Sequence, residues 1–270
     1  MRLEGTSALV AGGTSGLGLA TAAMLVEKGA HVVVLGRDRG RGEAAAARIG
    51  AAFEAGDVVD DAAVVSAIER ASAHGPLRAL VVCAGVGFAR RTIGRDGEYA
   101  SAHDLDPMRR LLETNVVGTF NCVRLGATAI SRTSADEDGQ RGAVVLTASA
   151  AAKAAQVGQV AYATSKAAVL GMVLPLARDL APVGIRVNAI SPGGFETGIF
   201  GPEGPPEELR AAVAGSTIFP RRMGAPNEFA TMALELLTNG YLNATNVDLD
   251  AGTRILPKRQ RSTAAQGGES

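Results

Sequence analysis

The chain has 270 residues, with 27 basic and 27 acidic side chains, so its formal net charge is zero. A neutral balance gives no general attraction to nucleic acids or anionic membranes, and we expect neither as a partner. Hydrophobic residues make up 47% and charged residues 20%, which excludes a disordered chain and suits one sizeable α/β domain. No run of about 18 apolar residues stands out, so no membrane span is expected.

The chain has two cysteines, Cys83 and Cys122, and three histidines. No spacing among them is typical of metal ligands, so no metal site is expected. Both cysteines lie in apolar patterns and are predicted to be free thiols, which suits a reducing cytoplasm. The N-terminus shows no signal-peptide pattern, and a cytoplasmic location is expected.

Short apolar runs alternate with helical patterns along the chain. Seven runs have the length and β-branched content of buried strands, at residues 7–11, 31–35, 52–54, 77–83, 143–146, 186–190 and 246–249. The helical patterns cover residues 18–28, 41–49, 60–73, 106–130, 160–180 and 227–237. Strands that are apolar throughout predict a parallel sheet with both faces covered. The predicted fold is therefore α/β: a single doubly wound, Rossmann-like domain over residues 1–257.

Three segments show no regular pattern, at residues 85–103, 131–142 and 191–222. The last contains five prolines and follows a predicted strand end, which predicts a substrate lid at about residues 195–222. In the first, Arg90, Arg91 and Arg95 could meet a phosphate of coenzyme A (CoA), although such arginines are more often solvated surface. Residues 258–270 are polar and predicted to be a disordered tail.

The first chemical motif follows the first strand directly and reads Gly12-Gly13-Thr14-Ser15-Gly16-Leu17-Gly18. Glycines spaced in this way permit a sharp turn, a close approach of the backbone to a pyrophosphate and close packing of helix on strand. The start of the next helix offers free amides and a positive dipole end to phosphates. Taken alone, the motif could also be an ordinary glycine-rich turn.

The second motif is Tyr162-Ala163-Thr164-Ser165-Lys166, inside a predicted helix. Tyr162 and Lys166 are four residues apart and share one helix face, where the ammonium would lower the pKa of the tyrosine. Such a tyrosine can act as general acid and base. Ser149 follows a predicted strand end and can hydrogen-bond a substrate carbonyl. Each piece alone also occurs as a solvated helix face or a turn serine.

In combination and in this order, these residues resemble the short-chain dehydrogenase/reductase family, over residues 2–257. Further matches are Asn115-Val116-Val117-Gly118, Cys83-Ala84-Gly85 and Pro192-Gly193 with Thr197. The resemblance implies an NAD(P)-dependent oxidoreductase that moves a hydride between nicotinamide and a small-molecule alcohol or ketone. Tyr162 would exchange the proton, Lys166 would bind the nicotinamide ribose, Ser149 would orient the carbonyl and Asn115 would hold a water.

The resemblance also implies which residues bind the cofactor and the substrate. The cofactor residues are Gly12, Thr14, Ser15, Gly16, Leu17, Gly18, Arg37, Asp57, Val58, Cys83, Ala84, Gly85, Tyr162, Lys166, Pro192, Gly193, Phe195 and Thr197. The substrate residues are Gln156 and Gly194.

Longer stretches resemble a subgroup, the type II 3-hydroxyacyl-CoA dehydrogenases, also called 17β-hydroxysteroid dehydrogenases type 10. These stretches cover residues 139–142, 147–149, 156–162 and 174–187, with short matches at 219–220 and 249–251. The resemblance implies a 3-hydroxyacyl-CoA/3-oxoacyl-CoA pair as substrate and a homotetramer. A ketoreductase for a steroid, polyketide or acyl-carrier-protein-bound substrate is the alternative. A non-catalytic cofactor-binding regulator is another, against which the complete set Ser149, Tyr162, Lys166 and Asn115 argues.

The end of the second predicted strand departs from that subgroup, which has an acidic residue there that bonds the ribose hydroxyls. Here Gly36 takes that place and Arg37 follows it. Without a carboxylate a 2′-phosphate is not repelled, and Arg37 can bind it with a forked donor. The sequence therefore favours NADP(H), with NAD(H) as the alternative. Asp38 could instead turn toward a ribose hydroxyl, and Arg37 could be an exposed turn residue.

Overall fold

The computed structural model describes residues 1–197 and 204–253. The tail expected at 258–270 and residues 198–203 of the expected lid lie outside these ranges. All strand pairs are parallel, and one seven-stranded sheet has the order β3-β2-β1-β4-β5-β6-β7. The strands are β1 Ser7–Ala11, β2 His31–Gly36, β3 Ala52–Ala55, β4 Leu77–Val82, β5 Gly142–Thr147, β6 Ile185–Pro192 and β7 Asn246–Leu249. The predicted fold class is confirmed.

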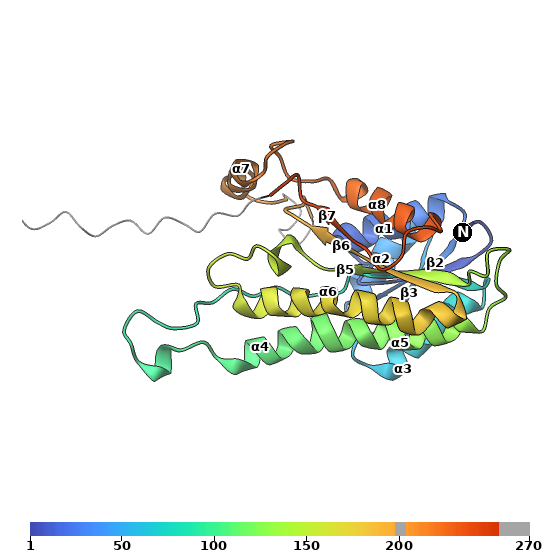
Figure 1. The fold of residues 1–270 in the computed structure, drawn as a ribbon, viewed down its shortest axis with the longest axis horizontal. Coiled ribbons are helices and arrows are strands. Elements are labelled where there is room, and N and C mark those ends of the chain that lie inside the picture. The colour runs from blue at the N-terminus through green and yellow to red at the C-terminus, as the bar shows by residue number, and fades with distance from the viewer. Residues whose placement is uncertain (198–203, 254–270) are drawn as a thin grey trace, which may run out of the picture.

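Helices cover both faces of the sheet (Figure 1). One face carries α1 (Gly16–Glu27), α2 (Arg39–Ile49) and α8 (Pro226–Thr238). The other carries α3 (Asp61–Ser72), α5 (Gly118–Ser131) and α6 (Val160–Leu180). Short 3₁₀ turns are η1 (Tyr99–Ser101), η3 (Ala150–Ala152) and η4 (Ala181–Val183). This arrangement leaves the carboxyl ends of the strands as the edge at which a ligand can bind.

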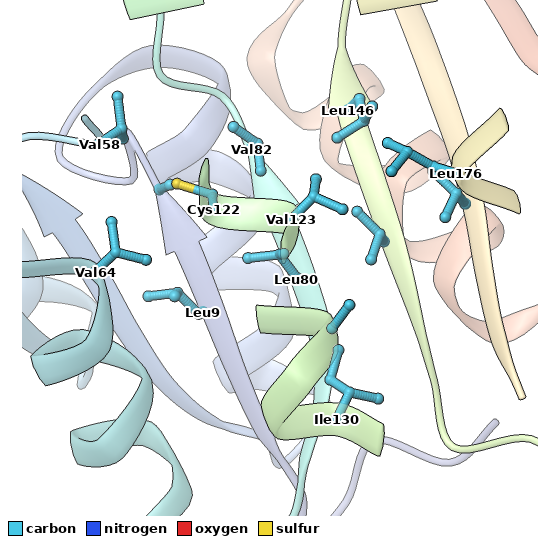
Figure 2. Packing of buried hydrophobic residues seen from close by; sticks show 14 of the residues in the cluster. Leu9, Val58, Val64, Leu80, Val82, Cys122, Val123, Ile130, Leu146 and Leu176 are labelled. Carbon is cyan, nitrogen blue, oxygen red and sulfur yellow. The ribbon is translucent and has the colours of Figure 1, made fainter. Parts of the chain in front are cut away.

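Alternate side chains of each strand enter two separate hydrophobic layers, because successive residues of a strand point to opposite faces. In β1, Leu9 packs in the layer under α3, α5 and α6, while Val10 packs in the layer under α1, α2 and α8. Figure 2 shows the first layer, in which Leu80 of β4 meets Cys122 and Val123 of α5. Because both faces are covered, the strands are mostly apolar rather than alternating between apolar and polar residues.

The helix predicted at residues 106–130 is interrupted by a π-helical turn. It consists of α4 (Leu105–Leu112), a π-helical turn η2 (Glu113–Val117) and α5. The amide of Gly118 bonds the carbonyl oxygen of Glu113, which accommodates one extra residue in the turn. Such a bulge leaves no mark in the hydrophobic pattern, and it places Asn115 at the centre of the turn with no exposed surface.

The segment 191–222 is also more regular than predicted. It contains α7 (Glu207–Ser216), a helix that begins with two glutamates, Glu207 and Glu208. Acidic residues in a first turn are stabilised by the helix dipole. Because prolines and glycines flank this helix on both sides, the sequence pattern did not predict it.

The sequence predicted no membrane span, but α6 with η4, Val160–Val183, is long and apolar enough to cross a membrane by length and composition. Core helices pass the same test. The apolar residues of α6 fit this second explanation, since Val169, Val173 and Leu176 are buried in the layer shown in Figure 2.

Candidate active site

A cavity of about 480 Å³ lies where β4, β5 and β6 end. Its wall is built from residues that follow these strands, from the first turns of α1 and α6, and from α7. Most of the lining is apolar, with a few polar groups, which is typical of small-molecule sites. The predicted site residues in this wall are Leu17, Cys83, Gly85, Ser149, Gln156, Tyr162, Lys166, Pro192, Gly193, Gly194, Phe195 and Thr197.

The other predicted site residues lie outside the wall of this cavity. Most of them follow β1, β2, β3 and β4 and continue along the same edge of the sheet, while Asn115 lies in η2. They are Gly12, Thr14, Ser15, Gly16, Gly18, Arg37, Asp57, Val58, Ala84 and Asn115.

The turn after β1 leaves its backbone open to a ligand. Gly12 has a φ of +77°, and a Cβ there would lie 2.5 Å from the nitrogen of Ala84. A Cβ on Gly18 would lie 2.3 Å from the carbonyl oxygen of Gly12, so both positions require glycine. Ser15 precedes α1 without a capping hydrogen bond from its side chain, which leaves the first amides of the helix for an anion. This cradle fits the diphosphate of a dinucleotide.

Ser149, Tyr162 and Lys166 meet in the cavity wall. Ser149 Oγ accepts a hydrogen bond of 3.1 Å from the amide of Ala151, so its hydroxyl proton remains free to donate, and it hydrogen-bonds Tyr162. Lys166 lies one turn after Tyr162 in α6 and is 5% exposed. Its Nζ donates to the carbonyl oxygen of Thr147, at the end of β5, over 2.8 Å.

The predicted lowering of the tyrosine pKa by lysine does not hold in this structure. Burial raises the pKa of Tyr162, and the hydrogen bond from Ser149 lowers it to a smaller extent. Burial also lowers the pKa of Lys166 to about 8, although the neighbouring Cys83 acts in the opposite direction. The physical reason is that both groups are removed from water and that the ammonium points to the Thr147 carbonyl.

The side chain of Asn115 is engaged with protein groups, and the water that the resemblance assigns to this residue stays a prediction. Its Nδ2 donates to the carbonyl oxygen of Val86 (2.9 Å) and to Ser165 Oγ (3.0 Å). Its Oδ1 accepts from the amide of Val86 over 2.8 Å. A Cβ on Gly85 would lie 3.3 Å from both Asn115 Oδ1 and Lys166 Nζ. Asn115 therefore ties the segment after β4 to α6 beside Lys166.

The charged side chains that follow β2 and β3 interact with other protein groups. Asp38 caps α2, and its carboxylate accepts from the amide of Arg41 over 3.0 Å, so it does not turn inward. Arg37 Nη1 lies 3.8 Å from Asp57 Oδ2, and two thirds of the Arg37 side chain is exposed. Val58 is buried and accepts from Asn121 through its carbonyl oxygen.

Sequence reasoning missed several residues of the wall. From α7 come Leu209, Val213 and Ser216, which lie within the predicted lid at residues 195–222 but were not singled out individually. Gln159 also lines the cavity, and its Oε1 accepts from the amide of Gln156 over 2.8 Å. The signal for Gln159 was present, since it lies three residues before Tyr162 and therefore on the same helix face.

Among residues 1–197 and 204–253, no three His, Cys, Asp or Glu side chains gather where they could hold a metal ion.

Comparison with known proteins identifies the family. A family model described as short chain dehydrogenase matches residues 6–208. The chain belongs to the short-chain dehydrogenase family. 3-Hydroxyacyl-CoA dehydrogenase type-2 from Bos taurus and from Homo sapiens are each 40% identical over 258 residues, which cover 94% of this chain and 97% of the relative. The crystal structure of 3-hydroxyacyl-CoA dehydrogenase type-2 from Mycobacterium avium is 42% identical, with a TM-score of 0.90 over 95% of this chain and 99% of that one.

Membership of the short-chain dehydrogenase family makes this protein an NAD(P)-dependent oxidoreductase, as the sequence predicted. The non-catalytic alternative is not favoured, because these relatives carry the name of an enzyme and the chain keeps Ser149, Tyr162 and Lys166 together. Steroid, polyketide and carrier-protein substrates are not favoured either.

Proposed function

We propose that this protein interconverts a 3-hydroxyacyl-CoA and a 3-oxoacyl-CoA, with NADP(H) as the preferred cofactor. The observation that carries the proposal is the meeting of Ser149, Tyr162 and Lys166 in one largely apolar cavity. The substrate class is supported by the relatives named 3-hydroxyacyl-CoA dehydrogenase type-2, which match 94% of this chain.

Tyr162 serves as the general acid and base. In reduction its phenol donates a proton to the oxygen of the former carbonyl, and in oxidation the phenolate takes that proton back. Because burial raises the pKa of Tyr162, the side chain is protonated at neutral pH and ready to donate. Ser149 has its Oγ held by the amide of Ala151, so its hydroxyl can donate to the substrate carbonyl and would orient it once the substrate is bound.

Lys166 and Asn115 act beside this pair. The ammonium of Lys166 is almost fully buried and donates to the carbonyl oxygen of Thr147 at the end of β5. It would also donate to the ribose hydroxyls of a bound cofactor. Asn115 is a positioning residue, because its amide links Val86 to Ser165, the residue that directly precedes Lys166. Both side chains hold the tyrosine and the reacting carbonyl in one geometry, which is a large part of catalysis.

The nicotinamide, when bound, supplies or accepts the hydride. The turn of Gly12 and Gly18 at the start of α1 would hold the diphosphate, since Ser15 does not cap the first amides of the helix with its side chain. Gly85 would lie beside the nicotinamide ribose, and Pro192 and Thr197 would lie at the nicotinamide end, where they line the cavity.

Three features support NADP(H) over NAD(H). Gly36 at the end of β2 carries no carboxylate that would repel a 2′-phosphate. Asp38 is occupied with the amide of Arg41. Arg37 follows Gly36 with an exposed guanidinium, which can bind a phosphate with two parallel hydrogen bonds.

A homotetramer is part of the proposal. Several large apolar side chains are about half exposed along η2, α5 and α6: Val117, Phe120, Val160 and Leu174. Burial of such side chains against other copies of the chain would stabilise an assembly. Light scattering after size exclusion tests this: a monomer at micromolar concentration contradicts it.

The proposed activity is tested with acetoacetyl-CoA, by following the oxidation of NADPH and of NADH in parallel. Rapid turnover supports the acyl-CoA reaction, and a higher kcat/KM with NADPH supports the cofactor preference. Binding of NADPH without turnover of acetoacetyl-CoA would show that the substrate belongs to another class of ketone.

A further inference from the structure

Residues 88–92, here called the ledge, run beside one wall of the cavity. Gly87, immediately before the ledge, lines the cavity. The amide of Arg90 donates to the carbonyl oxygen of Gly158 over 2.8 Å, and Gln159, next to Gly158, lines the cavity as well. The ledge therefore forms part of the rim around the cavity, between the segment after β4 and the start of α6.

The ledge is held in place by three contacts with residues 103 and 104. The amide of His103 donates to the carbonyl oxygen of Thr92 over 3.0 Å. The Arg90 guanidinium forms an ion pair with Asp104. The ring of Phe88 meets the His103 ring edge-to-face, with the centroids 5.6 Å apart. The backbone that carries Arg91 is thus anchored on both sides.

Arg91 has an exposed side chain and no ion-pair partner among residues 1–197 and 204–253. Two other cations close to cavity residues, Lys153 and Arg210, are neutralised by ion pairs. Lys153 lies 2.7 Å from Asp248, and Arg210 lies 3.1 Å from Glu196. An unpaired guanidinium on an anchored backbone at the rim of a cavity is a site for an anionic part of the substrate.

We propose that Arg91 binds a phosphate of the nucleotide part of a CoA thioester while the acyl group occupies the cavity. This inference rests on the proposed function. The cavity of about 480 Å³ must also take the nicotinamide end of the cofactor, so the nucleotide of CoA has to lie outside it. Phe88 on the ledge and Val157 opposite are 37% and 58% exposed, and they offer apolar surface to the pantetheine chain between the two ends.

The experiment compares two substrates with the same reacting group, acetoacetyl-CoA and acetoacetyl-N-acetylcysteamine, which lacks the nucleotide. Arg91→Ala should raise KM for acetoacetyl-CoA about fivefold to tenfold, because one charge-assisted contact with a phosphate is lost. Its kcat, and its KM for the truncated thioester, should not change. Arg91→Lys should keep most of the affinity. Arg48→Ala is the matched control, because Arg48 is an exposed arginine of α2 that does not line the cavity.

Salt gives a second readout. Exposed charge pairs are screened by ions, so KM of the wild type for acetoacetyl-CoA should rise with ionic strength more steeply than KM of Arg91→Ala. An unchanged KM for acetoacetyl-CoA in Arg91→Ala overturns the inference. So does an equal rise of KM for both thioesters, since that reports a disturbed cavity.

Failure of the proposed function is recognised separately, in the wild type. If the wild type reduces neither thioester, the proposed activity is wrong, and calorimetric binding of free coenzyme A then decides the role of Arg91. Weaker binding in Arg91→Ala than in the wild type and Arg48→Ala supports the inference, and equal or undetectable binding in all three overturns it.

Discussion

Thr14 and Gly36 pack so closely that a side chain at position 36 has no room: a Cβ built there would lie 2.7 Å from Thr14 Cγ2. Thr14 belongs to the glycine turn after β1 and is itself nearly buried. An acidic residue at the end of β2 would therefore force the side chain of Thr14 to move. The contact links the absence of a carboxylate at position 36 to the shape of the cofactor cradle.

The first prediction concerns the residue after Gly36. Arg37→Ala should lower kcat/KM for NADPH about tenfold and should change kcat/KM for NADH much less, because only NADPH carries the phosphate that the guanidinium binds. Steady-state kinetics with both cofactors measure the ratio. Arg39→Ala is the control, since Arg39 is exposed and pairs with Glu43 in its own helix. An equal loss with both cofactors would show that Arg37 acts only on the fold.

The second prediction concerns the proton donor. Tyr162→Phe removes the phenolic oxygen and keeps the ring, so kcat should fall by about 10² to 10⁴. Binding of NADPH, followed by its fluorescence, should stay close to that of the wild type. Tyr241→Phe is the matched control, because Tyr241 is 99% exposed. Substantial turnover by the Tyr162 variant would assign the proton transfer to another group.

The third prediction concerns stability and pH. Burial lowers the pKa of Lys166 to about 8, from 10.5 in the unfolded chain. Below about pH 8, Lys166 is charged in both the folded and the unfolded state. Between about pH 8 and pH 10.5, Lys166 is neutral in the folded protein but still binds a proton in the unfolded chain. Stability therefore rises with pH in this window, relative to a protein without the group. At pH 7 the burial of this charge lowers the free energy of unfolding by roughly 3 kcal/mol.

Lys166→Met removes this cost at the expense of activity and of one hydrogen bond, worth about 1 kcal/mol. The variant should melt at a higher temperature than the wild type at pH 7, with a smaller difference at pH 10. Thermal unfolding followed by circular dichroism measures both values. The same change at exposed Lys28 should alter the midpoint little at either pH. A lower midpoint for Lys166→Met at pH 7 would show that hydrogen bonding outweighs the burial of the charge.

The fourth prediction tests the contact between α7 and the residues after β6. A Cβ on Gly194 would lie 2.8 Å from Val213 Cγ1, so Gly194→Ala should push α7 away from the cavity. We expect kcat/KM for acetoacetyl-CoA to fall between about tenfold and a hundredfold, since small displacements in an active site are costly.

Gly215 provides the control within the same helix, because a Cβ there would meet no atom within 4 Å. Gly215→Ala should leave kcat/KM unchanged and raise stability by roughly 0.5 to 1 kcal/mol, as alanine replaces glycine in a helix. Normal kinetics in Gly194→Ala would mean that α7 does not shape the substrate site.

Much of the fold follows from local patterns. Runs such as residues 143–146 are apolar throughout because both faces of the sheet are covered, and this alone predicts parallel strands. The pairing of Tyr162 with Lys166 on one face is a property of any helix. The glycine turn is equally local, since only glycine tolerates the backbone approach at Gly12 and Gly18.

The rest depends on contacts between distant segments. Whether Lys166 faces Tyr162 or the Thr147 carbonyl depends on where β5 ends relative to α6. The side-chain amide of Asn115 donates hydrogen bonds to Val86 and Ser165, and the spacing of these residues in the sequence does not predict those contacts.

The sequence by itself determined the doubly wound sheet, the glycine turn and the residue types of the catalytic group, because these follow from periodicity and backbone sterics. The tertiary structure decided the π-helical turn, the place of α7 in the cavity wall and the close contact of Thr14 with Gly36. It also left Arg91 without an ion pair to any residue of 1–197 and 204–253. Burial, side-chain direction and charge pairing arise only when segments far apart in the chain pack together.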